Sequence, residues 1–154
     1  MSDNIGKLNA AIYRNLQSIL NYKLQEIPLR GGQHDFLYVI SKNEGITQKE
    51  LSQNLYVDKS TTAKAVKNLV WLGYVRKETS SEDKRFEKLY LTEKGQDMKK
   101  QVQETFSEIV DIATKNLSPK ESEQAVHLLK TILDGVTEEK MNLLNKKNEH
   151  AEDM

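Results

Sequence analysis

Apolar residues recur every three to four positions along nearly the whole chain, and one stretch departs from this helical spacing. Between residues 74 and 91, two short segments rich in β-branched and aromatic residues flank a polar turn. This pattern predicts a β-hairpin with strands at 74–79 and 86–91. Four helices are predicted before the hairpin and two after it, so we expect a mainly α fold with a two-stranded sheet.

Short polar signals set the bounds of the two helices just before the hairpin. Thr47 and Glu50 form a predicted capping box, in which each side chain bonds the backbone amide of the other, and a short helix follows. Asp58 is the predicted N-cap of the next helix, which ends near Leu72 because Gly73 suits a left-handed cap. Two short helices around a tight turn, followed by a hairpin, form the winged helix-turn-helix layout.

Longer amphipathic helices are predicted towards both ends of the chain. The first begins near Ile5 and ends before Pro28, and another is capped by Thr92. A second capping box, Ser118–Glu121, starts the last helix, which we expect to fray after Asn145, where the sequence becomes polar. A small lobe cannot cover the apolar stripes of both terminal helices, so self-association is expected to bury them.

The composition excludes several classes of function. The 154 residues include no cysteine, which excludes disulfides and thiolate zinc sites. No apolar run approaches the ~20 residues that span a bilayer, and no signal-peptide pattern opens the chain, so we expect a cytoplasmic protein without membrane contact. No catalytic set is recognisable, and neither an enzyme nor a cofactor is expected. No metal is expected at His34, His127 or His150, because they are not paired at ligand spacing.

Positive charge is concentrated in the segment that holds the fourth helix and the hairpin. The net charge of the chain is zero, yet residues 59–88 carry eight Lys and Arg against four Asp and Glu. Residues 89–154 carry nine against thirteen. A polyanion would meet the basic segment, and the acidic remainder would help to orient the molecule. Double-stranded DNA is therefore the predicted partner, and a winged helix that binds only protein is the alternative.

The fourth predicted helix carries the side chains that a recognition helix needs. We expect it to pack inward through Ala63, Val66, Leu69 and Val70. Its outward face then offers hydroxyl, amide and ammonium groups for bases and phosphates, from Ser60, Thr61, Lys64, Lys67 and Asn68. Thr61 lies in the first turn, where such helices meet base edges, whereas the long stems of Lys64 and Lys67 suit phosphates. Thr62 is a further candidate contact unless it packs inward.

Five motifs are spaced along the chain: Thr47–Leu55, Val57–Thr62, Leu69-x-x-x-Gly73-x-Val75, Asp83-Lys84-Arg85 and Leu89-Tyr90-Leu91-Thr92-x-x-Gly95. With them, the chain resembles the MarR/SlyA family over nearly its whole length. The Asp-x-Arg followed by Leu-x-Leu-Thr-x-x-Gly is the most specific part. The sequence departs from the family at Val70-Trp71-Leu72, where polar or charged residues are usual, and Trp71 would either pack across the base of the wing or be exposed.

The resemblance implies roles for the residues of the wing. Arg85 would enter the minor groove from the wing tip, and Asp83 would hold the wing or the arginine in position. A guanidinium suits a narrow minor groove because that groove concentrates negative potential. The expected DNA contacts also include Lys84 in the wing, with Gln48 and Lys49 at the start of the third helix.

The resemblance also implies one MarR-type domain over residues 1–154. Its expected parts are dimerisation helices at 1–28 and 118–146, a winged helix-turn-helix lobe at 29–95 and a connecting helix at 96–117. A homodimer would hold two recognition helices ~34–36 Å apart, to fit a pseudo-palindromic operator. A repressor is implied more often than an activator, with a small-molecule effector bound between the dimer helices and the DNA-binding lobe. The sequence identifies no effector-binding residue.

Overall fold

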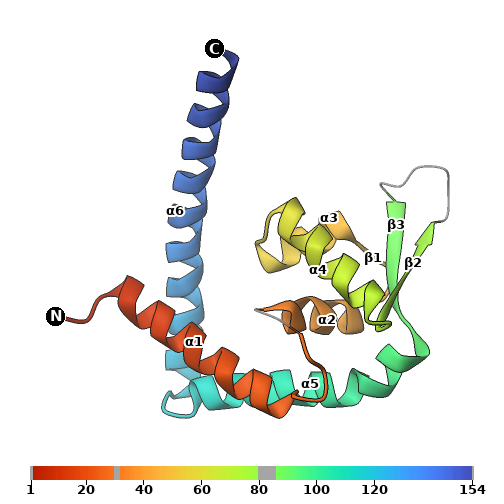
Figure 1. Ribbon diagram of the computed structural model, residues 1–154. Coiled ribbons are helices and arrows are strands. Elements are labelled where there is room, and N and C mark those ends of the chain that lie inside the picture. Colours follow the sequence, from red (N-terminus) through yellow and green to blue (C-terminus); the bar gives the residue numbers. More distant parts are fainter. Residues whose placement is uncertain (1, 30–31, 80–85, 154) are drawn as a thin grey trace. The chain divides into compact units, whose positions relative to one another are not determined.

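The computed structural model describes residues 2–29, 32–79 and 86–153 (Figure 1). The helices are α1 (Ile5–Lys23), α2 (Gln33–Lys42), α3 (Gln48–Leu55), α4 (Lys59–Trp71), α5 (Glu93–Thr114) and α6 (Pro119–Glu152). The strands are β1 (Ile46–Thr47), β2 (Val75–Thr79) and β3 (Glu87–Leu91). This order confirms the predicted mainly α, winged helix-turn-helix fold. No described helix combines the length and the apolar character needed to cross a membrane.

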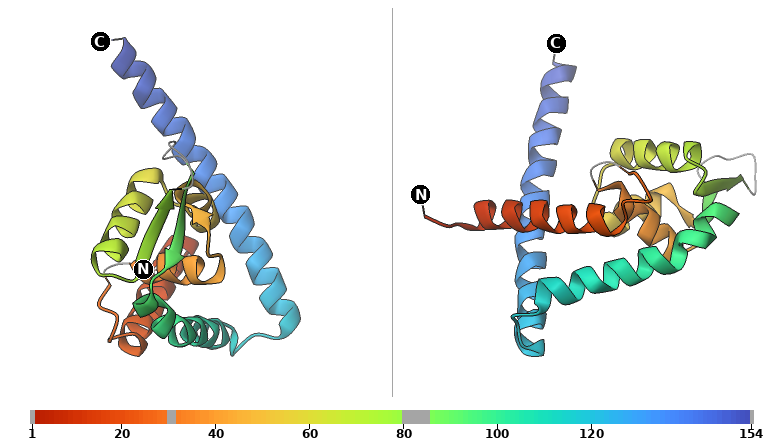
Figure 2. Two further views of the ribbon diagram at one scale, coloured as in Figure 1. Left: turned by 90° about the vertical axis from the view of Figure 1, so that its right-hand side faces the viewer. Right: turned by 60° about the horizontal axis from the view of Figure 1, so that its bottom comes forward.

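The chain divides into two compact units, residues 1–111 and 112–154. In the first unit, helices α2, α3 and α4 lie together beside the three strands (Figures 1 and 2). Their buried side chains form one core, centred on Leu37, Ile40, Leu51, Val66, Leu69, Val75 and Leu89. Helix α5 joins this core through Val102 and through Phe106, whose ring stacks on Tyr38 with the centroids 4.3 Å apart. The shared core fixes α4 relative to the hairpin.

The hairpin is part of a three-stranded antiparallel sheet in the order β1-β3-β2. Strands β2 and β3 confirm the predicted hairpin, and their register pairs Val75 with Leu91. The two-stranded sheet expected from the sequence is incomplete, because β1 pairs Ile46 with Leu89 of β3. Two residues are too few to show the alternation that identifies a strand in a sequence. The additional strand ties the start of α3 to the hairpin.

Three of the predicted helix boundaries rest on the expected local contacts. The Asp58 carboxylate accepts a 2.7 Å hydrogen bond from the Thr61 amide at the start of α4. Gly73 follows α4 with a φ of +85°, a conformation that glycine adopts at no steric cost. The Thr92 hydroxyl accepts a 3.1 Å hydrogen bond from the Gly95 amide at the start of α5. Each boundary depends on a residue within four positions of it, through a side-chain hydrogen bond or a glycine conformation, which is why the sequence reveals it.

The two predicted capping boxes differ in how completely they form. Ser118 and Glu121 exchange both side-chain-to-backbone hydrogen bonds at the start of α6. The Thr47 hydroxyl accepts a hydrogen bond from the Glu50 amide at 3.2 Å. The second bond of the box, from the Thr47 amide to the Glu50 carboxylate, is not formed in this described segment. Thr47 also belongs to β1, where pairing with Lys88 already fixes the backbone ahead of α3.

Helix α6 is 34 residues long and forms most of the second unit. The expectation that the chain frays after Asn145 is wrong, since the helix continues to Glu152. Residues 145–152 contain no Pro or Gly and include Lys, Glu and Ala, which favour helix, and His150 suits the dipole at the helix end. No described residue of α6 is buried. Its apolar stripe is therefore left open to solvent in the single chain.

Candidate nucleic-acid interface

Helix α4 packs on the core through one face and presents the remainder of its surface outward. The buried residues are Thr62, Ala65, Val66 and Leu69. The predicted inward set is right for Val66 and Leu69 but wrong for Ala63 and Val70, which are both exposed. The observed set follows three- and four-residue steps along one helix face, and this phase admits polar Thr62 while turning Ala63 outward.

The outward face of α4 holds four of the predicted DNA contacts: Ser60, Thr61, Lys64 and Lys67 are all exposed. The helix contains three lysines and no Asp or Glu, so this surface is positively charged. Asn68 is half-buried, and its side-chain amide donates a 2.6 Å hydrogen bond to Oε1 of Gln33. Asn68 thereby joins α4 to the start of α2, a contact that the sequence does not reveal.

Thr62 does not belong to this outward face, because its side chain is fully buried. Its hydroxyl accepts a 2.7 Å hydrogen bond from the Ser52 hydroxyl of α3 and donates to the Asp58 carbonyl at 3.1 Å. A side chain in this place has no access to DNA, so the inclusion of Thr62 among the DNA contacts is corrected here in favour of inward packing. Thr62 positions α4 instead.

The turn between α3 and α4 leaves the first turn of α4 at the surface. Tyr56 ends α3 in a left-handed conformation with a φ of +55°, which is uncommon for a residue other than glycine. The Val57 amide then donates to the Ser52 carbonyl at 3.0 Å, and Asp58 begins α4. A connection this short is typical of helix-turn-helix units.

A hollow of about 660 Å³ opens where α3, α4 and the start of β3 meet. Its lining includes the predicted residues Gln48 and Lys49, together with Lys59 at the first turn of α4. The fold thus brings these three side chains to one place. The lining also includes Phe86, which is 56% exposed. Lys59 and Phe86 are absent from the predicted site; the position of Lys59 beside Ser60 is a signal that the sequence offers, whereas the exposure of Phe86 depends on the fold.

The wing-tip residues Asp83, Lys84 and Arg85 lie outside the described residues. The strands on either side are described, and Thr79 at the end of β2 pairs with Glu87 at the start of β3. The basic side chains of β2 are paired with acids, Lys77 with Glu87 at 3.9 Å and Arg76 with Glu78 at 3.0 Å. Within the described part of the lobe, these pairs leave α4 as the more strongly positive surface.

His34, considered as a metal ligand in the sequence, lies in the core of the lobe. Its Nε2 atom is 2.9 Å from the Ile27 carbonyl oxygen. Burial lowers the pKa of the imidazole, and the hydrogen bond to Ile27 opposes this effect in part. Among the described residues, no three His, Asp or Glu side chains are grouped so that they could hold a metal ion.

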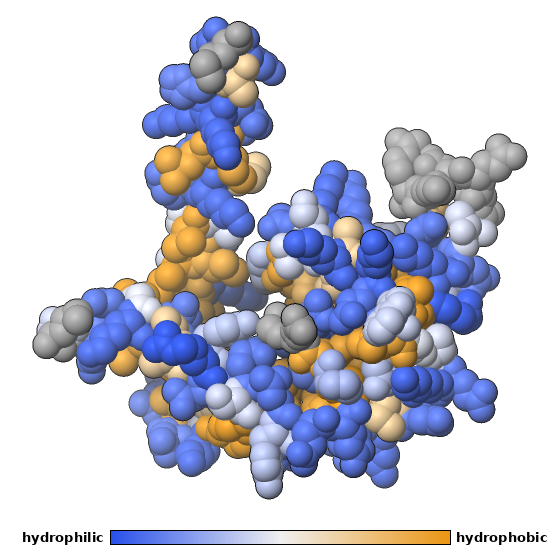
Figure 3. Space-filling view, in the orientation of Figure 1, coloured by the Kyte–Doolittle hydropathy of each residue, from blue (hydrophilic) through white to orange (hydrophobic). Residues whose placement is uncertain are grey.

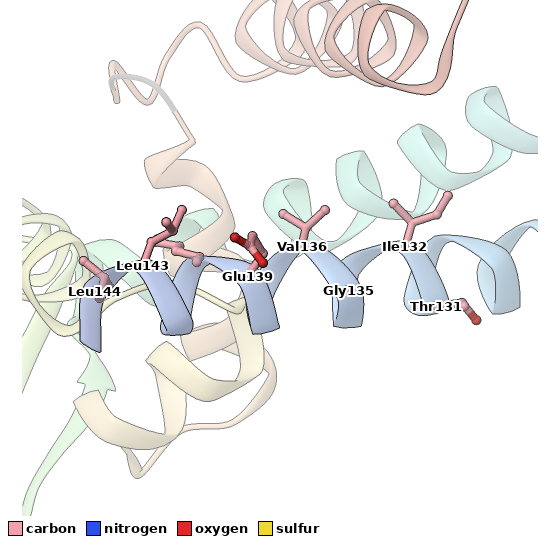
Figure 4. A pocket seen from close by; sticks show the side chains of 8 residues that line it. Thr131, Ile132, Gly135, Val136, Glu139, Leu143 and Leu144 are labelled. Atoms are coloured by element: carbon pink, nitrogen blue, oxygen red, sulfur yellow. The ribbon is translucent and has the colours of Figure 1, made fainter. Parts of the chain in front are cut away.

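A second candidate interface is the apolar stripe of α6. Its exposed apolar side chains are Val126, Leu128, Leu129, Val136, Met141, Leu143 and Leu144. Ile132, Val136 and Leu143 point to the same side of the helix (Figure 4), and hydrophobic surface follows α6 in Figure 3. The depression on this side is lined by α6 alone, so it is an open surface rather than an enclosed cavity. Helix α1 also exposes Ile5, Leu8 and Ile12.

Known proteins share both the sequence pattern and the fold. The model of the MarR family matches residues 27–85. The uncharacterized HTH-type transcriptional regulator YybA of Bacillus subtilis is 31% identical over 118 residues, which cover 77% of this chain and 79% of YybA. A MarR protein from Peptoclostridium difficile is 33% identical with a TM-score of 0.77, and the match covers 90% of this chain and 91% of that one. A MarR family transcriptional regulator from Listeria monocytogenes, solved with 26mer DNA, is 29% identical with a TM-score of 0.76. The match covers 90% of this chain and 92% of that one.

Proposed function

The chain belongs to the MarR family of transcriptional regulators, and we propose that it binds duplex DNA sequence-specifically as a homodimer. The observation that carries the proposal is the outward face of α4. Hydroxyl and ammonium groups stand exposed there, on a helix without acidic residues. The Listeria relative solved with 26mer DNA supports duplex DNA as the partner.

In this proposal, α4 enters the major groove with its first turn foremost. The Thr61 hydroxyl meets a base edge, because short side chains near a helix start reach the groove floor. Lys64 and Lys67 reach phosphates, as their ammonium groups act as point charges on long stems. Lys49 and Lys59, together at the hollow beside α4, extend the same positive surface towards the neighbouring backbone. Arg85 would reach the minor groove from the wing.

The homodimer would form through the exposed stripes of the terminal helices. Apolar side chains on α6 and α1 remain open to solvent in the single chain, and burying them between two copies is favourable by roughly 25 cal/mol per Å² of apolar surface. Pairing would hold two α4 helices about one turn of DNA apart, ~34–36 Å, which suits a pseudo-palindromic operator.

We further propose that the protein acts as a cytoplasmic repressor that a small-molecule effector releases from its operator. The support for this finer assignment is the resemblance to the MarR/SlyA family. Release requires an effector that binds the DNA-free dimer more tightly than the DNA-bound one, since a ligand shifts an equilibrium only by its differential affinity.

Selection from a random duplex pool, followed by binding measurements at low and high salt, tests the proposed function. We expect the selected sites to be inverted repeats, and binding to weaken steeply as salt rises, because lysine–phosphate contacts release counterions. The alternative, a winged helix that binds only protein, predicts no enriched sequence and no salt-dependent binding to any duplex.

A further inference from the structure

Trp71 is the last residue of α4 and the single tryptophan of the chain, and its side chain is 82% exposed. It follows Ser60, Lys64 and Lys67 at steps of four, three and four residues, so all four lie on the same side of the helix. The sequence left open whether Trp71 packs across the base of the wing or is exposed, and the structure shows that it is exposed. An indole combines a large apolar face with an N–H donor, and such residues are enriched at interfaces.

At the end of α4, near Trp71, the carbonyl groups that would repel an anion are hydrogen-bonded. Free carbonyl groups at the carboxyl end of a helix carry partial negative charge and repel anions. Here the Lys94 ammonium donates a 2.9 Å hydrogen bond to the Leu72 carbonyl. The Gly73 amide bonds the Val70 carbonyl at 3.0 Å, and the Tyr74 amide bonds that of Leu69 at 3.0 Å. Lys67 thus precedes Trp71 by one helical turn, and Lys94, whose ammonium also lies 4.5 Å from the centre of the Tyr74 ring, offsets the negative end of the helix.

The length of α4 determines which part of DNA Trp71 can reach. At ~1.5 Å per residue, Trp71 lies roughly 16 Å along the helix axis from Ser60. The major groove is only about 12 Å wide. The major groove is also only about 8.5 Å deep. When α4 enters with its first turn foremost, as proposed above, its last turn therefore lies outside the groove, beside the sugar–phosphate backbone that borders it.

We infer that Trp71 is a DNA-backbone contact: its indole face packs on a deoxyribose, and its N–H donates to a phosphate oxygen. This inference rests on the proposed function and adds to it an anchor that does not depend on the base sequence. A contact to sugar and phosphate fixes the register and the tilt of the recognition helix while carrying no base information directly.

The binding test compares Trp71→Ala with three other variants, each on a selected duplex and a scrambled one. Trp71→Ala removes a hydrogen bond to a charged phosphate and the packing of the indole. It is expected to weaken binding to both duplexes alike, by about tenfold. The log–log salt slope should stay unchanged because the indole is neutral, whereas Lys67→Ala should lower it by about one unit. Val70→Ala, next to Trp71 on another side of α4, should leave binding unchanged. Trp71→Phe, which keeps a ring without the N–H, should give an intermediate loss.

Fluorescence of the unmodified protein provides a second test that needs no variant, because Trp71 is the sole tryptophan. Saturating duplex DNA should reduce acrylamide quenching of its emission. Unchanged quenching, while a labelled duplex shows binding, would overturn the inference and leave the proposed function standing. Quenching that falls with protein concentration before DNA is added would place Trp71 between copies of the chain and overturn it as well. A loss for Trp71→Ala confined to the selected duplex contradicts a backbone role. If neither duplex binds the unmodified protein, the proposed function fails, and the inference with it.

Discussion

The hydroxyl of Ser52 on α3 donates a 2.7 Å hydrogen bond to the hydroxyl of Thr62 on α4, and both side chains are buried. The Thr62 hydroxyl in turn donates to the carbonyl of Asp58, the residue that caps α4. The first turn of the candidate recognition helix is therefore held against α3 by a buried polar chain. The placement of its base contacts depends on groups that do not themselves touch DNA.

Thr62→Val keeps the shape of the side chain and removes its hydroxyl. We expect a loss of about 1–3 kcal/mol in the free energy of unfolding, because the buried Ser52 hydroxyl loses its acceptor. Urea unfolding measures this loss, and Thr61→Val at the exposed neighbouring position should change stability by less than about 0.5 kcal/mol. The double variant Ser52→Ala/Thr62→Val should lose less than the two single variants together, as coupled sites do. A Thr62→Val variant as stable as the parent would contradict the structural role.

His34 makes stability depend on pH. Burial lowers its native pKa below the ordinary value of 6.5, so the unfolded chain takes up the proton first as the pH falls. The free energy of unfolding should therefore decrease below about pH 6.5, by at most about 1.4 kcal/mol per pH unit.

His34→Gln retains an N–H group for the Ile27 carbonyl but does not titrate, so its stability should fall less between about pH 7.5 and pH 5.5. Burial raises the pKa of Asp35, an effect of the opposite sign that both proteins share. Equal pH dependence of the two proteins in urea unfolding would rule out His34 as the source.

The apolar stripe of α6 predicts the oligomeric state. Light scattering at micromolar concentration should give a mass near twice the 17.7 kDa of one chain. Val136→Glu places a charge in the stripe and should shift the equilibrium towards monomer, because burying an unpaired carboxylate is costly. Asn145→Glu adds the same charge nine residues later, on the opposite side of the helix, and should leave the dimer intact. A monomeric mass for the parent protein would exclude the dimer.

Arg85 lies outside the described residues, and its role is predicted from the sequence. Arg85→Ala should weaken DNA binding without changing the fold or the mass of the dimer. The loss should be larger on A·T-rich flanks than on G·C-rich ones, because A·T-rich minor grooves are narrower and attract a guanidinium more strongly. Equal dissociation constants for the variant and the parent on both flanks would exclude a minor-groove role.

The sequence predicts those features that depend on neighbouring residues. The caps at Asp58 and Ser118 and the hairpin follow from side chains a few positions apart, and the structure confirms them. Two of the four predicted inward residues of α4 are right. Hydrophobicity favours Ala63 and Val70, whereas the phase of the helix on the core buries Thr62 and Ala65 instead.

The sequence pattern does not predict contacts between residues that are far apart in the chain. Strand β1 exists only through its pairing with β3, and the Gln33–Asn68 hydrogen bond joins residues that are far apart in the chain. The hollow beside α4 likewise gathers side chains from three separate elements. None of these follows from local periodicity or capping.

A salt titration of Thr61→Ala and Lys67→Ala on selected and scrambled duplexes tests the central claim, that the outward face of α4 reads and grips DNA. Loss of the Thr61 hydroxyl should lower the preference for the selected duplex, by about 1–3 kcal/mol if a good base contact is removed. Loss of the Lys67 ammonium should weaken binding to both duplexes alike. It should also reduce the slope of the logarithm of the binding constant against the logarithm of the salt concentration by about one unit. Binding by both variants that matches the parent protein on both duplexes, at every salt concentration, would contradict the assignment of α4 as the recognition helix.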